Sequence, residues 1–267
     1  MSLKLGINEN ITNSVYHSDK TYLSSSNLKT LLKDPMQFYK EKILGEREER
    51  SSASFDEGTY THLAILEPHL LEQEVAVYDG WRKHGQDWEN FKEANEGKLL
   101  LSKPQKFRCD EYVKAFERNE AAVAMLKGGA PEYTICSKIL DVPVKIRADY
   151  INIDKGYIAD IKTTGYGAGT PVFKNTVQQF MYQLSAALYC QVAYDHFGKL
   201  FDFYFVVISK TDLQCDVYKA SPTTLNEGHS LVNKALVLYK KCLDTGLWKL
   251  DQPMQHNFGL DYEIEEV

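Results

Sequence analysis

Four charged residues between positions 147 and 162 stand where a β-hairpin would bring them onto one face. Arg147 and Asp149 lie in one β-branched run, and Asp160 and Lys162 lie in the next. The segment between them, Asn152-Ile-Asp-Lys-Gly156, carries a turn signal. With Asp-Lys at the turn, Asp149 faces Asp160 and Arg147 faces Lys162. All four side chains then share one face, because side chains alternate along a strand. A hairpin slipped by one residue would instead set Asp149 opposite an apolar neighbour.

This pattern predicts a site for a hard divalent cation. Two carboxylates that face each other across neighbouring strands have Cβ atoms only about 4.5–5.5 Å apart, and like charges so placed repel. A cation with oxygen ligands relieves that repulsion, and the lysine supplies an ammonium group beside it. The alternative is a solvated face with cross-strand charge pairs. We favour the cation because the paired carboxylates, the lysine and the arginine fall on one face. The opposite face is predicted to be core: Ile146, Ala148, Ala159 and Ile161.

The ordered set Arg147-x-Asp149 and Asp160-Ile-Lys162 resembles the core of the PD-(D/E)xK nucleases, in which an Asp on one strand and an Asp/Glu-x-Lys on the next hold a metal ion. More narrowly, the chain is similar to the phage and prophage exonuclease VIII (RecE-like) branch, which has a Gly-x-x-x-His helix upstream. Gly58-Thr-Tyr-Thr-His62 matches that helix. The other matching pieces lie between about residue 16 and about residue 195: Tyr22-Leu-Ser-Ser-Ser, Gly85-x-x-Trp88-x-x-Phe91 and Thr163-Thr164.

The resemblance implies a metal-dependent exodeoxyribonuclease. Asp149, Asp160 and the backbone carbonyl of Ile161 would hold Mg²⁺, with Mn²⁺ able to substitute. His62 would lie on or near the same ion, as a ligand or as the support of one.

Other residues are predicted to act on the substrate. Lys162 would orient the attacking water or stabilise the charge that develops on phosphorus oxygens, and Arg147 would neutralise a non-bridging oxygen. Thr163 follows the lysine and is a further substrate-binding candidate. The helix predicted over 175–197 resembles the Gln/Tyr helix that flanks the active site of related nucleases, in which the spacing is Gln-x-x-x-Tyr. That spacing does not settle which residue matches, and Gln183 and Tyr189 are the candidates.

The relatives degrade linear duplex DNA processively from 5′ ends. They leave 3′ single strands for an annealing partner in phage-type homologous recombination, and many are ring-shaped oligomers. The resemblance therefore implies DNA ends as substrate, 5′ to 3′ digestion, a single-strand annealing protein as partner and a ring-shaped homo-oligomer. Two alternatives stay open. One is an endonuclease or single-strand nuclease on the same core, and the other is a catalytically inactive DNA-binding module.

Composition sets bounds on these functions. The five cysteines are widely spaced, without a Cys-x-x-Cys pair, which argues against a disulfide framework, zinc or an iron–sulfur cluster. The net charge of −6 argues against a protein that coats nucleic acid, but it leaves room for a local basic lining. Without a long apolar run or a signal-peptide pattern, a cytoplasmic protein with no membrane contact is expected.

The remaining pattern predicts the elements that hold the site. We expect an α/β mixed sheet with helices on both faces, the PD-(D/E)xK restriction-endonuclease-like core, in one nuclease domain. Within it, residues 1–130 form a mainly helical portion that carries His62, residues 131–250 form the catalytic sheet core, and residues 251–267 form an acidic tail. Expected elements are a helix after Ser24, a strand at 75–78, helices at 103–127 and 175–197, a strand buried on both faces at 200–209, and a helix at 223–243.

Overall fold

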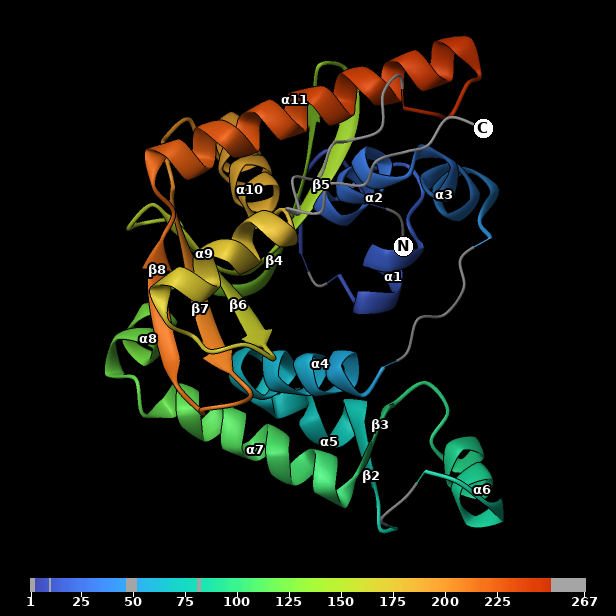
Figure 1. Ribbon diagram of the computed structural model, residues 1–267, viewed down its shortest axis with the longest axis vertical. Coiled ribbons are helices and arrows are strands. Elements are labelled where there is room, and N and C mark those ends of the chain that lie inside the picture. The colour runs from blue at the N-terminus through green and yellow to red at the C-terminus, as the bar shows by residue number, and fades with distance from the viewer. Residues whose placement is uncertain (1–2, 10, 47–51, 81–82, 251–267) are drawn as a thin grey trace, which may run out of the picture.

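The computed structural model describes residues 3–9, 11–46, 52–80 and 83–250. Its centre is a six-stranded sheet in the order β1-β4-β5-β6-β7-β8, in which only β6 and β7 run parallel (Figure 1). The strands are β1 Gly6–Asn8, β4 Ala130–Ile139, β5 Val142–Asn152, β6 Tyr157–Thr164, β7 Asp202–Ser209 and β8 Cys215–Lys219. The parallel pair requires a crossover, which α9 Thr170–Gln179 and α10 Tyr182–Phe197 provide.

The turn between β5 and β6 sets the predicted register. The side chain of Asn152 accepts a hydrogen bond from Lys155 N at 2.9 Å, and its carbonyl accepts one from Gly156 N at 2.9 Å. Gly156 has φ 70°, a conformation that costs little without a Cβ. The ladder then runs Asn152 opposite Tyr157, Ile151 opposite Ile158 and Tyr150 opposite Ala159. This is the register that makes Asp149 and Asp160 the next facing pair.

Helices cover both faces of the sheet, which confirms the predicted fold class. β7 is buried on both sides. Its Phe203 and Phe205 pack with α9 and α10, while Val206 and Ile208 pack with α7 Lys103–Glu117 and α8 Glu120–Met125. β6 follows the same alternation, with Ile158 on the α10 side. The predicted core residues 146, 148, 159 and 161 are all fully buried.

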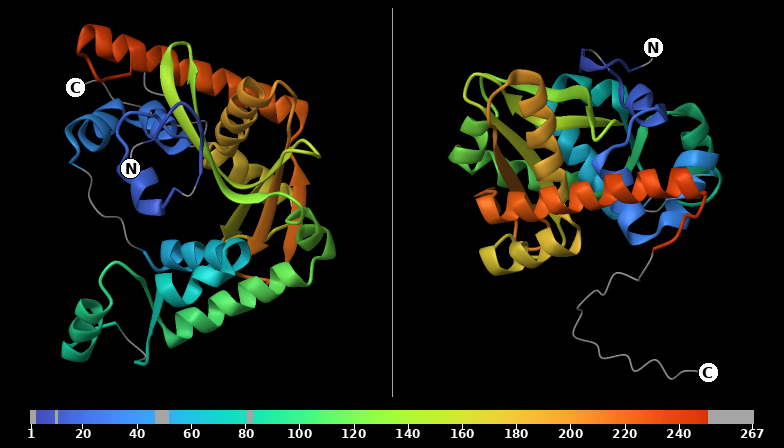
Figure 2. Two further views of the ribbon diagram at one scale, coloured as in Figure 1. Left: turned by 180° about the vertical axis from the view of Figure 1, so that it is seen from behind. Right: turned by 90° about the horizontal axis from the view of Figure 1, so that it is seen from above.

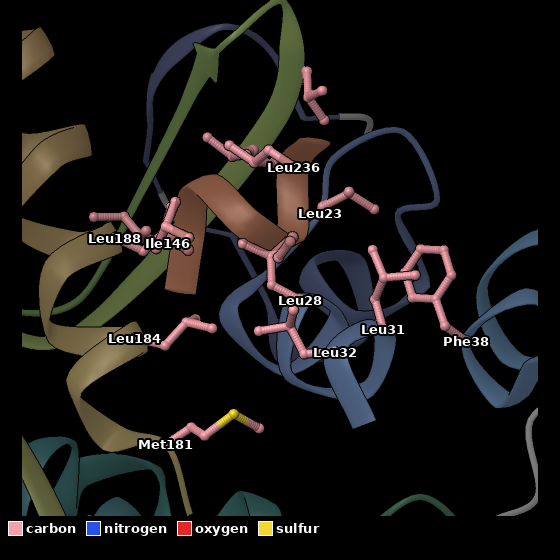
Figure 3. Close-up of a cluster of buried hydrophobic side chains, with 14 of the residues drawn as sticks. Leu23, Leu28, Leu31, Leu32, Phe38, Ile146, Met181, Leu184, Leu188 and Leu236 are labelled. Carbon is pink, nitrogen blue, oxygen red and sulfur yellow. The ribbon is translucent and has the colours of Figure 1, made fainter. Parts of the chain in front are cut away.

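A second layer on the α10 side is formed by α2 Ser25–Lys33 and α11 Pro222–Thr245. Ser24 caps α2 with a capping box, as its position before the apolar repeat predicts. Leu28 and Leu32 of α2 pack against Leu184 of α10 and Ile146 of β5 (Figure 3). At Gly228, α11 lies so close to α10 that an added Cβ would collide with the carbonyl of Gln183 and lie 2.7 Å from the Ala187 Cβ. Both views in Figure 2 show α11 lying along the outside of this layer.

The prediction of one helix over 175–197 was wrong. The chain instead forms α9 and α10, separated at Phe180 and Met181, and Met181 takes a left-handed conformation with φ 48°. The helical spacing of apolar residues continues through the break, which is why periodicity did not reveal it. The break makes Tyr182 the first residue of α10.

The remaining elements surround this core. The predicted helix over 103–127 is likewise divided, because Asn119 caps a new helix by accepting from Ala122 N. The strand at 75–78 forms as predicted and pairs in parallel with β3 in a separate two-stranded sheet. The acidic tail, residues 251–267, lies outside the described residues. The other bounds are α1 Asn13–Ser18, α3 Pro35–Phe38, the π-helix η1 Tyr39–Leu44, α4 Ala53–Leu66, the 3₁₀ helix η2 Pro68–Leu70, α5 Leu71–Glu74, β2 Val75–Tyr78, α6 Gln86–Ala94 and β3 Leu99–Ser102.

Candidate active site

The candidate site lies where β5 separates from β6. The β-ladder between these strands ends at Tyr150 and Ala159, and beyond this point β5 continues to pair with β4. The carboxylate of Asp149 takes over as acceptor there, because its Oδ2 accepts a hydrogen bond from Ile161 N at 2.7 Å. Asp149 therefore reaches toward β6 from the last position before the strands part.

Asp160 and Lys162 project from β6 toward the same place. The Lys162 ammonium forms an ion pair with Asp160 Oδ2 and a long contact of 3.4 Å with the carbonyl of Ile161. Asp160 is only 4% exposed, and within the described part of the chain its Oδ2 accepts no well-oriented hydrogen bond. A carboxylate can accept several partners, so pairing with one ammonium leaves lone pairs of Asp160 that a bound cation could use.

Electrostatics couple the two carboxylates. Burial raises the pKa of Asp149, the charge of Asp160 raises it further, and His62, Lys162 and the Ile161 N–H oppose the shift. For Lys162, burial alone would lower the pKa, but Asp160 and Asp149 outweigh burial and raise it above the ordinary lysine value. The lysine is therefore charged at neutral pH, which suits a hydrogen-bond donor and does not suit a general base.

His62 comes to this site on α4. Its Nδ1 lies 3.4 Å from Asp149 Oδ2, and both side chains are mostly buried. Ser52 caps the start of α4, and Gly58 lets the helix approach β6, since an added Cβ would lie 3.3 Å from the Thr163 hydroxyl oxygen. The predicted Gly-x-x-x-His spacing thus places the glycine against the strand and the histidine, one turn later, beside the carboxylate.

Arg147 does not face Lys162 as predicted. At this position β5 pairs with β4 alone, and the guanidinium donates to Thr134 Oγ1 at 3.1 Å, Asn13 Oδ1 at 2.6 Å and the carbonyl of Ile11. It also stacks on Tyr16, and the residue is 8% exposed. These contacts hold the N-terminal segment against the sheet and leave the guanidinium no free edge for a phosphate.

The other three predicted substrate residues differ in their surroundings. Thr163 lies under α4 at Gly58. Gln183 is 3% exposed and donates to Gln178 Oε1 at 3.0 Å, while its own Oε1 has no partner within the described ranges. Burial, followed by the neighbouring Tyr16 and then by the charges of Asp160 and Asp149, raises the pKa of Tyr189 well above the usual tyrosine value. Tyr189 is therefore the candidate of α10 that the fold brings toward the carboxylates.

Two residues at the site were not among the predicted site residues. Tyr182, the first residue of α10, places its ring 5.3 Å from Lys162 Nζ and 5.2 Å from Lys29 Nζ, measured to the ring centroid. From the sequence alone, Lys29 and the serines before it are candidates for a phosphate contact at a helix N-terminus, with simple helix capping as the alternative. The position of Lys29 beside Tyr182 and Lys162 depends on the packing of α2 on α10 and on the unpredicted break before Tyr182, which the local pattern does not show.

Glu132 is a further acidic residue beside the site. On β4 its neighbours pair in register with β5, Pro131 opposite Tyr150 and Tyr133 opposite Ala148, so Glu132 stands across from Asp149. Its backbone departs from the regular strand conformation there, with φ 46°. Burial, together with the charge of Asp149, raises the pKa of Glu132 to about 8. The signal that could have found it is its place opposite Asp149 in the β4–β5 hairpin.

The residues at this site fit a hard divalent cation in part. The Asp160 carboxylate, the Asp149 carboxylate and the Ile161 carbonyl are oxygen donors of the type that Mg²⁺ prefers. Among the described residues, no three His, Cys, Asp or Glu side chains converge closely enough to form a metal site by themselves. The set therefore consists of two carboxylates and a backbone carbonyl, with His62 Nδ1 3.4 Å from Asp149 Oδ2.

Known proteins resemble this chain in fold and in family. A solved structure from Eubacterium rectale described as "Putative exonuclease" is similar over 95% of this chain and 100% of its own, with a TM-score of 0.64 at 17% identity. A structure of SSO0001 covers 80% of this chain and 85% of its own, at 15% identity and a TM-score of 0.30. No match is found among curated proteins. Within the described ranges, no helix has both the length and the apolar character needed to cross a membrane.

Residues 24–250 match the family described as "PDDEXK-like domain of unknown function (DUF3799)". This range contains the Asp149, Asp160 and Lys162 constellation together with α4 and α10. The chain belongs to this PDDEXK-like family, within the PD-(D/E)xK nuclease superfamily.

Proposed function

We propose that the protein is a Mg²⁺-dependent exodeoxyribonuclease that hydrolyses phosphodiester bonds of linear duplex DNA. The observation that carries this proposal is the convergence of Asp149, Asp160 and Lys162 where β5 and β6 part, with Asp160 buried and, among the described residues, ion-paired with Lys162 alone. A module that only binds DNA gains nothing from two like charges buried side by side. A hydrolase that must recruit a cation does.

Asp149, Asp160 and the Ile161 carbonyl would hold the ion, with His62 fixing the orientation of Asp149 or contributing directly. When bound, Mg²⁺ or Mn²⁺ acidifies a coordinated water and offsets negative charge on the phosphate. The Ile161 N–H already fixes Asp149 Oδ2, which leaves its other oxygen for the ion.

Lys162 would act as a fixed donor. Its raised pKa keeps the ammonium charged, and Asp160 holds it next to the reacting phosphate. From there it can orient the attacking water or stabilise the charge that develops on the phosphorane oxygens. Arg147 takes no part in this mechanism, because its guanidinium is engaged by the N-terminal segment.

The direction of digestion and the biological setting rest on the RecE-like resemblance. On that basis the enzyme would digest 5′ to 3′ and supply 3′ single strands to an annealing protein in phage-type recombination, as a cytoplasmic enzyme that forms a ring-shaped homo-oligomer. Residues 1–130 and 131–250 would act together as one nuclease domain, because His62 of the first part contacts Asp149 of the second.

Digestion of linear and circular duplex DNA labelled at either end, with Mg²⁺ or with a chelator, tests the proposal. We expect loss of label from 5′ ends of linear DNA only, and only with metal. Asp202→Asn is the matched control for Asp160→Asn, because Asp202 is an exposed carboxylate on the neighbouring strand β7. Cleavage of circles would favour the endonuclease alternative, and wild-type protein that binds DNA but leaves all of it intact would favour the inactive module.

A further inference from the structure

The structure assigns Lys29 as a phosphate-binding residue of the substrate strand, an inference that rests on the proposed function. Two ammonium groups, those of Lys29 and Lys162, approach one ring, that of Tyr182, at 5.2 and 5.3 Å from its centroid. They therefore lie no farther apart than the sum of these distances, in a region where both lose much of their hydration.

Only one of these two ammonium groups has a protein counter-ion. Lys162 is paired with Asp160, whereas within the described ranges no carboxylate forms an ion pair with Lys29. Lys29 is half-buried, and two of the charges that act on it are the Lys162 ammonium, which lowers its pKa, and the Asp160 carboxylate, which opposes that shift but is already ion-paired with Lys162. A partly desolvated ammonium beside a second one is unfavourable unless an anion completes the group. In a nuclease, that anion is available as a phosphate of the nucleic acid.

The fold holds this arrangement in place before any substrate arrives. Leu28 and Leu32, which flank Lys29 on α2, are fully buried against Leu184 of α10 (Figure 3). The Tyr182 ring is fixed from other sides by Phe173, Phe180 and Phe205. Both cations thus lie beside one fixed aromatic ring, with Lys162 proposed to lie at the scissile phosphate and Lys29 at the next phosphate along the strand or at its end.

Burial also explains why Lys29 responds to an anion. Loss of hydration, followed by the charge of Lys162, lowers the pKa of Lys29 to about 7, and a bound phosphate would restore the charged form. Lys33 provides a matched control, because it lies one turn further along α2 and is exposed. Lys29→Met and Lys33→Met remove the same charge from the same helix, and Lys29→Arg keeps the charge.

The test is equilibrium binding of short duplexes in a chelator, where no cleavage occurs. The duplexes carry a 5′-phosphate, a 5′-hydroxyl, or one neutral methylphosphonate at the first or second internal linkage. We expect Lys29→Met to weaken binding about tenfold and to reduce the dependence of binding on salt by about one phosphate contact, while Lys33→Met changes neither. Removing or neutralising the phosphate that Lys29 contacts should weaken binding to wild type but not binding to Lys29→Met. Lys29→Arg should restore this dependence of affinity on the phosphate.

The duplex arms identify which phosphate is bound. If removing the 5′-phosphate weakens binding to wild type but does not change the affinity of Lys29→Met, Lys29 binds the terminal phosphate monoester. If instead one methylphosphonate weakens binding to wild type but does not change the affinity of Lys29→Met, Lys29 binds the diester at that linkage. The inference is overturned if every replacement weakens wild type and Lys29→Met equally, or if Lys29→Met and Lys33→Met behave alike while both remain folded by thermal melting. Either result would leave the nuclease proposal intact, provided that the wild-type protein digests DNA with Mg²⁺. If the wild-type protein does not digest DNA but its DNA binding depends on Lys29, only the nuclease proposal is rejected.

Discussion

Glu57 and Asp160 are both almost fully buried carboxylates, at 6% and 4% exposure, but they differ in how many hydrogen-bond and ion-pair partners they have. Glu57 accepts two hydrogen bonds from Arg108, at 2.6 and 3.0 Å, and its other oxygen lies 3.4 Å from the Tyr112 hydroxyl and 3.5 Å from Lys210 Nζ. Asp160 has only Lys162, and its Oδ2 accepts no well-oriented hydrogen bond within the described residues. The first centre joins α4 to α7 and to the end of β7. The second is left with capacity for an external cation.

This difference distinguishes a carboxylate that stabilises the fold, Glu57, from one that is expected to act on a ligand, Asp160. A buried ion that the protein satisfies fully contributes mainly to the integrity of the fold, and its loss exposes unpaired partners. A buried ion that the protein leaves incomplete is retained at a cost in stability, which is expected where it acts on a ligand. Substitutions at the two centres should therefore affect different properties.

Asp160→Asn should have the largest effect on activity. With the metal site weakened, we expect digestion to fall about 1,000-fold, equivalent to about 4 kcal/mol of transition-state stabilisation. DNA binding in a chelator and the melting temperature should change little. Initial rates on end-labelled linear DNA measure the effect, and a variant that retains more than a tenth of wild-type activity would contradict the assignment.

Glu57→Gln should show the reverse pattern. Removing the charge leaves Lys210 and the half-exposed Arg108 without their counter-ion, so we expect a loss of about 2 kcal/mol in the free energy of unfolding. Urea titration measures it. Glu111→Gln, which removes a more exposed ion pair on α7, is the control and should cost less than about 1 kcal/mol. If Glu57→Gln abolished digestion while leaving stability unchanged, the two centres would not differ in the way proposed.

His62→Gln should affect the use of metal more than the fold. The histidine contacts Asp149 and favours its ionised form, so its loss should weaken metal affinity about tenfold. The readout is the Mg²⁺ concentration that gives half-maximal digestion. His69→Gln, at an exposed histidine just beyond α4, is the control. Equal Mg²⁺ dependence in both variants would remove His62 from the site.

Glu132→Gln should give the smallest effect, one that depends on pH. The folded-state pKa of Glu132 is raised to about 8, so the folded protein binds a proton that the unfolded chain has released. In a chelator, wild-type stability should therefore fall as pH rises from the ordinary glutamate range to about 8. Glu132→Gln should reduce this decline, and Glu9→Gln should not. Parallel stability curves for wild type and Glu132→Gln between pH 5 and 9 would show that the pKa of Glu132 is not raised in the folded protein.

The sequence revealed most where the determinants were local. The Asn152 to Gly156 turn fixes its own hydrogen bonds, so the register that sets Asp149 against Asp160 could be predicted from a short segment. The position of Arg147 could not, because its partners lie at residues 11, 13 and 134, which meet it only after the N-terminal segment packs on β4 and β5.

The same distinction holds for the helices. The capping box at Ser24 and the apolar repeat of α2 are local, and they form as predicted. The break at Met181 lies within a continuous apolar stripe, so nothing in the spacing marks it. Lys29 and Tyr182 come together only through that break and through the packing of α2 on α10. Tertiary packing therefore decides the position of the proposed substrate-binding residue Lys29, while the carboxylate pair follows from one hairpin.

Gly228 gives this dependence a practical consequence. Because α11 has no room for a methyl group against Gln183 and Ala187, Gly228→Ala would displace the beginning of α10, including Tyr182. Gly228 is buried and contacts neither carboxylate, so this change would act on Tyr182 and Lys29 through the packing of α11 on α10. If Lys29 binds substrate as proposed, the defect would be one of substrate alignment.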